Sequence, residues 1–320
     1  MPPLIELKDV SFSYSTGNGS VEALSGLNLS IDDGSFVAIV GSNGSGKSTF
    51  AKLLNALIVP SSGSVVVDGL DSHDKSNVYA IRSKVGLVFQ NPDNQIVSDT
   101  IEDDIAFGLE NMGLGVDEMK RRLEVCLSLT GLAALRHCSP DMLSGGQKQL
   151  VAIAGILAMQ PKCVVLDEAT AMLDPNGRRM VLGLCHRLNH EIGMTVVLIT
   201  HHMEECIDAD RVVVFDKGHL AMDGTPREVF SNAPLTRSLG FKLPPVTELA
   251  EHLISFGIDI PHGILTSEEL CSALKSAYAK DVHAKEDHAK DVHAKEVHAK
   301  EVHAKEIHAK GSSAKVVHDV

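Results

Sequence analysis

The stretch GSNGSGKST, residues 41–49, decides the fold class of this chain of 320 residues. It fits the pattern G-x-x-x-x-G-K-[ST], follows the continuous apolar run FVAIV (36–40), and leads into the helical stretch TFAKLLNAL. The glycines let backbone N–H groups turn towards phosphate oxygens, and the start of the following helix adds the positive end of its dipole. A buried strand, this loop and a helix, in that order, predict a nucleotide phosphate-binding loop.

Within this loop each residue type has a chemical reason to be present. Lys47 can reach the β- and γ-phosphates of a nucleotide, and Ser48 can ligate Mg²⁺. A chance glycine-rich loop is the alternative, and the correct flanks on both sides count against it. The predicted nucleotide-binding set is Gly41, Ser42, Asn43, Gly44, Ser45, Gly46, Lys47, Ser48 and Thr49.

The surrounding pattern indicates an α/β fold. Two segments, 4–14 and 21–31, alternate apolar and polar residues and predict strands separated by a turn at 16–20. Strand–helix alternation downstream predicts a sheet whose carboxyl edge binds ligands. Buried strands are expected at 85–89, 163–167, 195–200 and 211–215, and helices at 145–159 and 175–191.

Two carboxylates end one of the predicted strands, in CVVLDEAT (163–170). Asp167 can hold Mg²⁺ directly or through water, and Glu168 can polarise the water that attacks a γ-phosphate. Solvated acids at a strand end are the alternative, which loses ground beside a phosphate-binding loop.

A second anion-binding helix start is predicted at LSGGQKQ (143–149). A hydroxyl and bare backbone N–H groups at a helix N-terminus suit an anion. Because one loop already serves one nucleotide, the second start points to the nucleotide of another subunit. A simple helix cap by Ser144 is the alternative. The residues concerned are Ser144, Gly145, Gly146 and Gln147.

Composition excludes several classes of protein. The formal net charge of -13 argues against a nucleic-acid binder with a basic surface. The N-terminus carries Glu6 and Asp9 where a signal peptide would be apolar. The apolar run near LVAIAGILAMQP is shorter than the ~20 residues that cross a bilayer. Six scattered cysteines without a C-x-x-C pair favour reduced thiols in a cytosolic protein.

Residues 4–235 resemble the ATP-binding subunits of ABC transporters, with the three motifs in the order of that family. The resemblance implies a P-loop NTPase fold with a mixed-sheet core, an antiparallel β subdomain and a helical signature subdomain, and binding of ATP and Mg²⁺. It implies that Tyr14 stacks on adenine, that Gln90 contacts Mg²⁺ or the water and senses the membrane subunit, and that Leu173 and Asp174 cross a dimer interface. His201 matches the switch histidine near the γ-phosphate, and its neighbour His202 is the weaker candidate.

The segment 89–111 and the stretch GTPREVF…LPPVTELAEHLISFGIDI look like energy-coupling factor transporters, which take up vitamins or transition-metal ions such as cobalt and nickel. DEATAMLDPNGR resembles the first of the two ATPases that such importers pair. The resemblance implies a peripheral protein at the cytoplasmic face of the membrane. Its partners would be a second ATPase subunit, identical or different, a transmembrane coupling subunit and a membrane substrate-binding subunit, and no nucleic acid. Leu150 departs from the family, which usually has arginine there, and this puts a charge contact of the helix in doubt.

Two other functions stay open at this point. One is the ATPase subunit of a conventional ABC transporter. The other is a soluble ABC-type ATPase acting on nucleic acid or ribosomes. The single motif set, the absence of a long insertion within 49–143 and the negative charge all weigh against the second.

Three regions are predicted: an ATP-binding domain at 1–240, a C-terminal extension at 241–280 with helices near 246–256 and 266–279, and a pentad-repeat tail at 281–320. In the tail, acids precede lysines by four residues, which favours a solvated helix. Histidines five apart would point to different sides of that helix, so metal binding needs a flexible coil or several chains. A solvated low-complexity tail and a weak metal-binding tail both stay open.

Overall fold

A computed structural model of the chain describes residues 2–17, 19–280, 282, 283, 290, 295–297 and 300. The chain divides into two compact units, Met1–Pro245 and Val246–Val320. Most of the pentad repeat lies outside the described residues, so its helical or flexible state and its metal binding stay predictions.

The first unit is built on a six-stranded sheet in the order β10-β9-β3-β8-β7-β6. Five neighbouring strands run parallel, and β10 pairs with β9 antiparallel. Every residue of β3, β7 and β8 is buried, as continuous apolar runs require when helices or a second sheet cover both faces. The strands are β3 Phe36–Gly41, β6 Val85–Val88, β7 Cys163–Asp167, β8 Thr195–Thr200, β9 Arg211–Asp216 and β10 His219–Gly224. The five parallel strands were predicted, whereas β10 was not.

A second sheet of four antiparallel strands has the order β2-β1-β4-β5. The predicted pair of alternating segments forms a hairpin, in which β1 and β2 pair from Ile5 opposite Ile31 to Thr16 opposite Gly19, with register shifts between Leu7 and Ser13. The bounds are β1 Ile5–Thr16, β2 Gly19–Ile31, β4 Ser62–Val67 and β5 Leu70–Asp71. This sheet is the antiparallel subdomain that the family resemblance implied.

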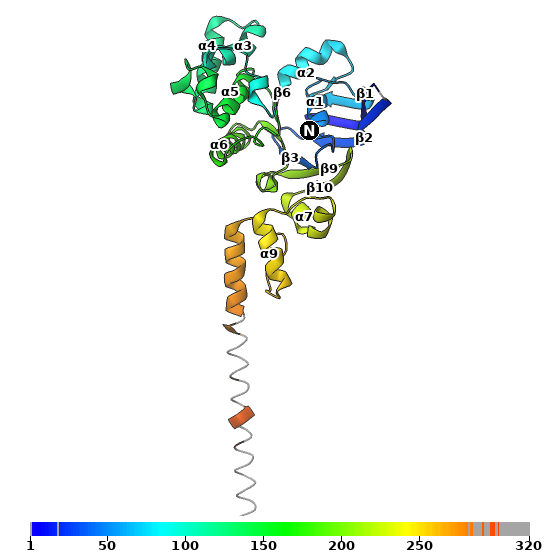
Figure 1. Ribbon diagram of the computed structural model, residues 1–320, viewed down its shortest axis with the longest axis vertical. Coiled ribbons are helices and arrows are strands. Elements are labelled where there is room, and N and C mark those ends of the chain that lie inside the picture. Colours follow the sequence, from blue (N-terminus) through cyan, green and yellow to red (C-terminus); the bar gives the residue numbers. More distant parts are fainter. Residues whose placement is uncertain are drawn as a thin grey trace, which may run out of the picture. The chain divides into compact units, whose positions relative to one another are not determined.

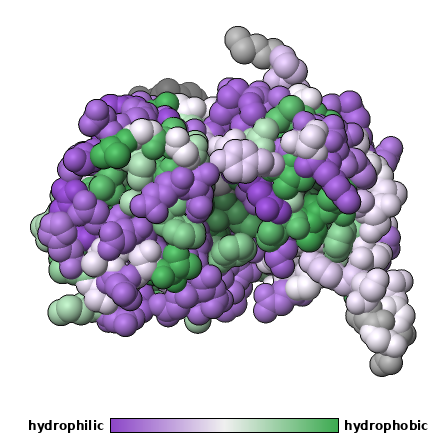
Figure 2. Space-filling view, turned by 90° about the horizontal axis from the view of Figure 1, so that it is seen from above, coloured by the Kyte–Doolittle hydropathy of each residue, from purple (hydrophilic) through white to green (hydrophobic). Residues whose placement is uncertain are grey.

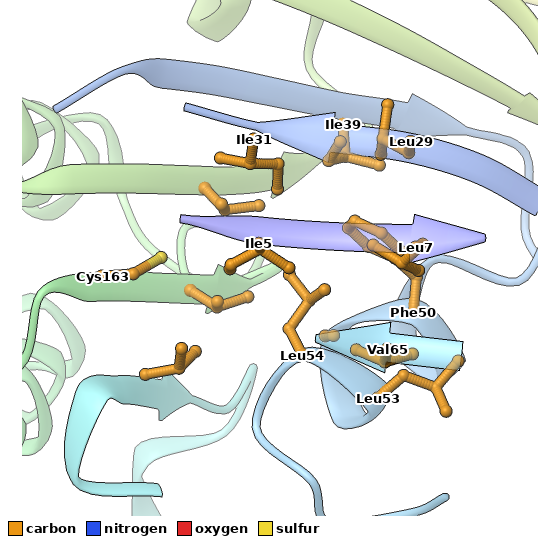
Figure 3. Packing of buried hydrophobic residues seen from close by; sticks show 14 of the residues in the cluster. Ile5, Leu7, Leu29, Ile31, Ile39, Phe50, Leu53, Leu54, Val65 and Cys163 are labelled. Atoms are coloured by element: carbon orange, nitrogen blue, oxygen red, sulfur yellow. The ribbon is translucent and has the colours of Figure 1, made fainter. Parts of the chain in front are cut away.

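The main hydrophobic core joins the two sheets around α1 (Lys47–Leu54), the helix that follows the phosphate-binding loop. Phe50, Leu53 and Leu54 are completely buried. Figure 3 shows them among side chains of the antiparallel sheet, such as Leu7 and Val65, and of the parallel sheet. Truncating a side chain such as Phe50 to alanine would cost about 3–5 kcal/mol. The loop is therefore anchored at both ends, by β3 and by α1.

Three helices form a separate group in which α3 and α4 pack against α5 (Figure 1). Their bounds are α3 Ile101–Asn111, α4 Val116–Thr130 and α5 Gly145–Ala158. α3 begins where the Thr100 hydroxyl accepts from the backbone N–H of Asp103, and α4 ends at Gly131 in the left-handed conformation. This group is the helical signature subdomain that the resemblance implied, and α5 confirms the predicted helix at 145–159.

Shorter helices complete the first unit. The predicted helix at 175–191 is α6 (Pro175–His186) continued by a π-helical turn, Arg187–Glu191. α2 spans Val78–Lys84, and α7 (Pro226–Ser231) and α8 (Ala233–Ser238) follow β10. All six cysteines, which lie in the described part of the chain, are free thiols, as predicted.

The second unit has its own small core. α9 (Pro245–Ser255) and a helical segment at 267–280 confirm the two predicted helices. Ala250, Ile260, Ile264 and Leu270 are buried together. The Thr247 hydroxyl, also buried, donates to the carbonyl of Ile264 at 2.7 Å.

Candidate functional site

The predicted phosphate-binding loop, 41–49, contains a lysine that bonds to the backbone of the loop itself. Lys47 is 5% exposed, and its Nζ donates to the carbonyls of Gly41 at 2.7 Å and Ser42 at 3.2 Å. Gly46 has a φ of 102°, and a Cβ there would lie 2.6 Å from the carbonyl oxygen of Ala23. Only glycine fits that backbone and that close approach. The loop therefore presents backbone and an ammonium group, with residues 42–44 exposed at its tip.

A hydroxyl and a carboxylate meet beside the loop. The Ser48 hydroxyl donates to Asp167 Oδ1 at 3.1 Å, across 119 residues of sequence. Asp167 ends β7 and is 8% exposed, and burial raises the pKa of its carboxyl group. The Tyr14 hydroxyl lies 3.1 Å from the hydroxyl of Thr49, also on α1, and Tyr14 is 39% exposed.

The donor set at this edge suits Mg²⁺. The ion prefers oxygen ligands, and it is usually held by one or two carboxylates plus substrate phosphates. The Ser48 hydroxyl and the Asp167 carboxylate offer such a pair. The buried Ser45 hydroxyl, within the loop, has no hydrogen-bond partner among the residues that the structure describes. The loop thus leaves a polar atom free for an added ligand.

Glu168 stands next to this pair in a strained conformation. Its φ of 52° lies in the left-handed region, which is costly for a residue with a Cβ and often marks functional sites. Its backbone N–H donates to the carbonyl of Ile199 on β8. Its carboxylate lies 3.4 Å from Lys47 Nζ and 3.7 Å from His201 Nδ1. Two other segments, the start of α1 and the residues that follow β8, therefore converge on the Glu168 carboxylate.

The predicted signature residues form a different site, at the start of α5. The Ser144 hydroxyl accepts from the backbone N–H of Gln147 at 3.3 Å, and the Gln147 side chain accepts from the backbone N–H of Ser144 at 3.0 Å. This capping box realises the simple cap that the sequence left open. Ser144 and Gly145 are nonetheless exposed.

Leu173 and Asp174 lie against that helix start. The Asp174 carboxylate accepts from the backbone N–H of Gly177 at 2.9 Å and so caps α6. A Cβ on Gly146 would lie only 2.5 Å from the Cα of Gly177. The two helix starts are therefore in backbone contact, which glycine at both positions allows.

The sheet edge and the start of α5 are not joined within the described chain. Among the described residues, no hydrogen bond or ion pair links the loop 41–49 to residues 144–147. Gln90, two residues beyond the end of β6, is exposed and bonds to neither site. The structure thus brings together Lys47, Ser48, Asp167, Glu168 and His201, and it leaves Gln90 and the signature residues apart.

The last two residues of the signature motif, Lys148 and Gln149, have a role that the sequence did not reveal. Gln149 is completely buried, and its Nε2 donates to the carbonyl of Phe89 at 3.1 Å. Lys148 Nζ lies 2.7 Å from Asp93 Oδ1. Together they tie the segment that carries Gln90 to α5. Leu150 is buried at 3% exposure, so an apolar side chain fills the place where the family usually has arginine.

An apolar cleft of about 510 Å³ lies between α2, β6, α3 and α5. The end of the unit that carries these elements is seen in Figure 2, where hydrophobic side chains occupy a hollow between two lobes. Tyr79, Val97 and Phe107 line the cleft while being 64%, 65% and 50% exposed. Asp104, 8% exposed, also lines it, and burial raises the pKa of its carboxyl group.

A nucleotide loop at a sheet edge, together with a second glycine-bearing helix start that faces outwards, defines an ATP-binding cassette. The sequence profile of the ABC transporter family matches residues 24–171. The chain is 49% identical over 272 residues to "Energy-coupling factor transporter ATP-binding protein EcfA1" of Clostridium novyi, covering 85% of this chain and 97% of that protein. It is 52% identical over 268 residues to the protein of the same name from Caldanaerobacter subterraneus, covering 83% and 97%.

Solved structures agree with this similarity. "Structure of cbiO1 from clostridium perfringens: Part of the ABC transporter complex cbiONQ" matches with a TM-score of 0.68 at 35% identity, over 78% of this chain and all of that one. A dimeric cassette, MJ0796, bound to ADP and Pi matches with a TM-score of 0.64 at 32% identity, over 70% and 99%.

The chain therefore belongs to the ABC transporter family, among the ATP-binding subunits of energy-coupling factor transporters. Such a subunit hydrolyses ATP to drive transport. Within the described residues, no helix is long and apolar enough to span a bilayer.

Proposed function

We propose that this chain powers the uptake of a vitamin or a transition-metal ion, such as cobalt or nickel, as the first of two paired ATPases. The likeness of segment 89–111 to energy-coupling factor importers supports the import direction and the cargo class. The likeness of DEATAMLDPNGR supports its place in the pair. The observation that carries the catalytic assignment is the convergence of Lys47 and His201 on the Glu168 carboxylate.

Hydrolysis begins with phosphate binding in the loop 41–49. The Lys47 ammonium, which neutralises Glu168 and bonds to Gly41 and Ser42 in this structure, turns to the β- and γ-phosphates. The Tyr14 ring, accessible at the rim, stacks on adenine. Positioning and charge stabilisation dominate phosphoryl transfer, so these contacts supply much of the catalysis.

Glu168 then polarises the attacking water. Once phosphate engages Lys47, the carboxylate of Glu168 is free to accept a proton from water. His201, 3.7 Å away, contacts the γ-phosphate from the far side. Ser48 and Asp167 would hold Mg²⁺, and Gln90 would supply a further ligand. When bound, the ion neutralises charge on the phosphates.

The start of α5 completes the site of another ATPase subunit. Ser144, Gly145 and Gly146 are arranged for phosphate but make no bond to this chain's own loop. Met142 and Met172, which flank the signature loop and the loop before α6, are 81% and 66% exposed. Exposed methionines beside an anion-binding helix start support a surface that is covered by a partner. This chain and a second ATPase subunit would close head to tail around two ATP molecules.

The apolar cleft receives a helical segment of the transmembrane coupling subunit. Large side chains exposed in a concave surface favour a helix that inserts its apolar face. The cleft is adjacent to the segment of Gln90, since Phe89 and Gln95 line it. This contact would hold the protein at the cytoplasmic face of the membrane, and a membrane substrate-binding subunit would supply specificity for the cargo.

The docking proposal predicts that Phe107→Asp releases the membrane partner. A charge in an apolar contact loses the burial of the ring and adds a desolvation cost. Val125→Asp is the matched control, because Val125 is equally exposed, at 52%, but lies on α4 away from the cleft. Affinity purification of tagged chain from membranes should recover the transmembrane subunit with V125D and not with F107D. Recovery with both would exclude this cleft.

The catalytic proposal predicts that Glu168→Gln keeps ATP binding and lowers turnover by about a hundredfold or more, the usual range for loss of a general base. Glu191→Gln changes an exposed glutamate in the same way and should leave turnover unchanged. The measurements are steady-state phosphate release and retention of radiolabelled ATP. Normal hydrolysis by E168Q would overturn the role of Glu168.

A further inference from the structure

A buried polar cluster begins two residues after Glu168, at the end of β7. It joins Thr170, just after β7, to Arg178 on α6 and to Glu205 in the short 3-10 helix Met203–Cys206. The Glu205 side chain is completely buried, and the Arg178 side chain is 25% exposed. None of these residues takes part in the hydrolytic steps described above.

Glu205 is the centre of this cluster. Its Oε2 accepts from the Thr170 hydroxyl at 2.8 Å, and its Oε1 lies 3.3 Å from Arg178 Nε. A buried carboxylate without a cation would be strongly destabilising, so Arg178 is needed beside it. Yet within the described residues neither Glu205 Oε1 nor Arg178 Nε has a hydrogen-bond partner. The pair is close but not aligned, and a small shift of α6 would complete the bond.

His202 connects this pair to the catalytic site. Burial, with Arg178 alongside, lowers the pKa of its imidazole group, which favours the neutral ring. Arg178 Nη2 lies 3.0 Å from His202 Nε2. Because arginine can only donate, Nε2 must accept, and the ring proton sits on Nδ1. The centroid of the His201 ring lies 4.2 Å from that of His202.

Arg178 lies one turn into α6, the helix that follows residues 171–174. Asp174 caps α6, and the backbone N–H of Arg178 donates to the Asp174 carbonyl at 3.0 Å. A movement of residues 171–174 is therefore carried to Arg178 through a single turn of helix. Thr170 lies two residues after Glu168, so the other end of the cluster is fixed to the catalytic strand.

We propose that Arg178 and Glu205 are positioning residues that make hydrolysis depend on contact with the partner subunit. When a partner presses on residues 171–174, α6 shifts, the bond between Arg178 and Glu205 closes, and His202 holds His201 towards Glu168. Without that contact, the misaligned pair leaves His201 loosely placed. The inference rests on the roles proposed above for Glu168 and His201.

Substitution of Arg178 tests this proposal, with the neighbouring arginine as control. Arg178→Met keeps an unbranched side chain and removes the guanidinium group, with its charge and hydrogen bonds. Arg179→Met changes an exposed arginine that, among the residues that the structure describes, bonds to Asn176 of its own helix. Both would be made in the full chain assembled with its ATPase and membrane partners, and kcat, KM for ATP and the Hill coefficient for ATP would be measured.

We expect R178M to lower kcat about tenfold or more, as misplaced catalytic groups do, with KM changed by less than about twofold. The Hill coefficient should fall towards one, while R179M stays normal in all three. Arg178→Lys should recover part of kcat. A merely structural role predicts a lower melting temperature with unchanged kcat and Hill coefficient for the folded fraction, and that result would overturn the proposal.

Glu205→Gln keeps the proposal testable if R178M does not fold. It retains the acceptor for Thr170 and removes only the charge that faces Arg178. We expect E205Q to reproduce the kcat and Hill defects, and R178K/E205Q to be no worse than E205Q alone. Normal kinetics in E205Q would contradict the inference. E168Q is measured in parallel to separate the positioning role of Arg178 and Glu205 from the catalytic role of Glu168. Normal turnover in E168Q would refute the catalytic role of Glu168, not the positioning role.

Discussion

The sheet edge around Lys47 and the start of α5 around Ser144 are both suited to phosphate, but they differ in how complete they are. At the sheet edge, the ammonium of Lys47 and the carboxylate of Asp167 are buried and already paired within the chain. At α5, Ser144 and Gly145 are exposed and satisfied only by their own helix cap. One chain therefore carries two different half-sites. The catalytic half-site, around Lys47 and Asp167, has its polar groups paired within the chain, whereas the covering half-site, around Ser144, is left open to a partner.

The largest effect is expected at the covering half-site, where the starts of α5 and α6 are in backbone contact. Gly146→Ala would place a Cβ 2.5 Å from the Cα of Gly177, which forces α5 and α6 apart. We expect a loss of about 1–3 kcal/mol in the free energy of unfolding, as for overpacking elsewhere. Urea denaturation measures it, and nucleotide binding by the folded fraction should persist, since the sheet edge is separate.

Gly183→Ala provides the contrast for that variant. Gly183 lies within α6, and a Cβ there would have nothing within 4 Å. Alanine should raise the free energy of unfolding by up to about 1 kcal/mol, through helix propensity. Equal losses in G146A and G183A would show that the contact between the two helix starts does not matter.

A smaller effect is expected at His202, near the catalytic half-site, where the free energy of unfolding should depend on pH. The charged groups facing it are Arg178, Glu204, Glu205 and, when protonated, His201. Its pKa is lowered from 6.5 in the folded protein, so below about pH 6.5 the unfolded chain binds the proton first. The neutral His202 ring therefore contributes to the free energy of unfolding above pH 6.5. This contribution is lost as the pH falls to the lowered pKa of His202 in the folded protein.

The corresponding variant is His202→Gln. As the pH falls below about 6.5, its free energy of unfolding should decrease less steeply than that of the wild-type protein, because the difference in protonation between the folded and unfolded states is gone. His219→Gln, at an exposed position on β10, is the control and should keep the wild-type slope. Identical slopes for all three proteins would remove His202 from the account.

Sequence alone was sufficient where a motif is contiguous. The loop 41–49 needs glycines, a lysine and a serine at fixed spacing between a strand and a helix, and all of these can be read along the chain. The buried parallel strands were equally clear, because they are apolar without interruption. β10 was missed because HLAMDG carries no strand-type run, and its residues are alternately exposed and half-buried.

Contacts between distant residues could not be read in this way. Gln149 and Phe89 are 60 positions apart, and Thr170 and Glu205 are 35 apart. The sequence does not indicate which segment a buried glutamine or glutamate will contact, because the folding of the whole unit determines its hydrogen-bond partner. The apolar cleft is similar, since its lining comes from four elements, each of which looks like an ordinary amphipathic or buried segment.

The start of α5 is proposed to act on the nucleotide of another subunit. Ser144→Arg in the Glu168→Gln background, studied with the ATPase chain that co-purifies with it, tests this most directly. We expect ATP affinity, measured by equilibrium binding to the isolated chain, to equal that of E168Q alone. ATP-driven association of the two ATPase chains, measured by light scattering, should be lost. Association that survives S144R, or ATP affinity of the isolated chain that falls with it, would contradict the account.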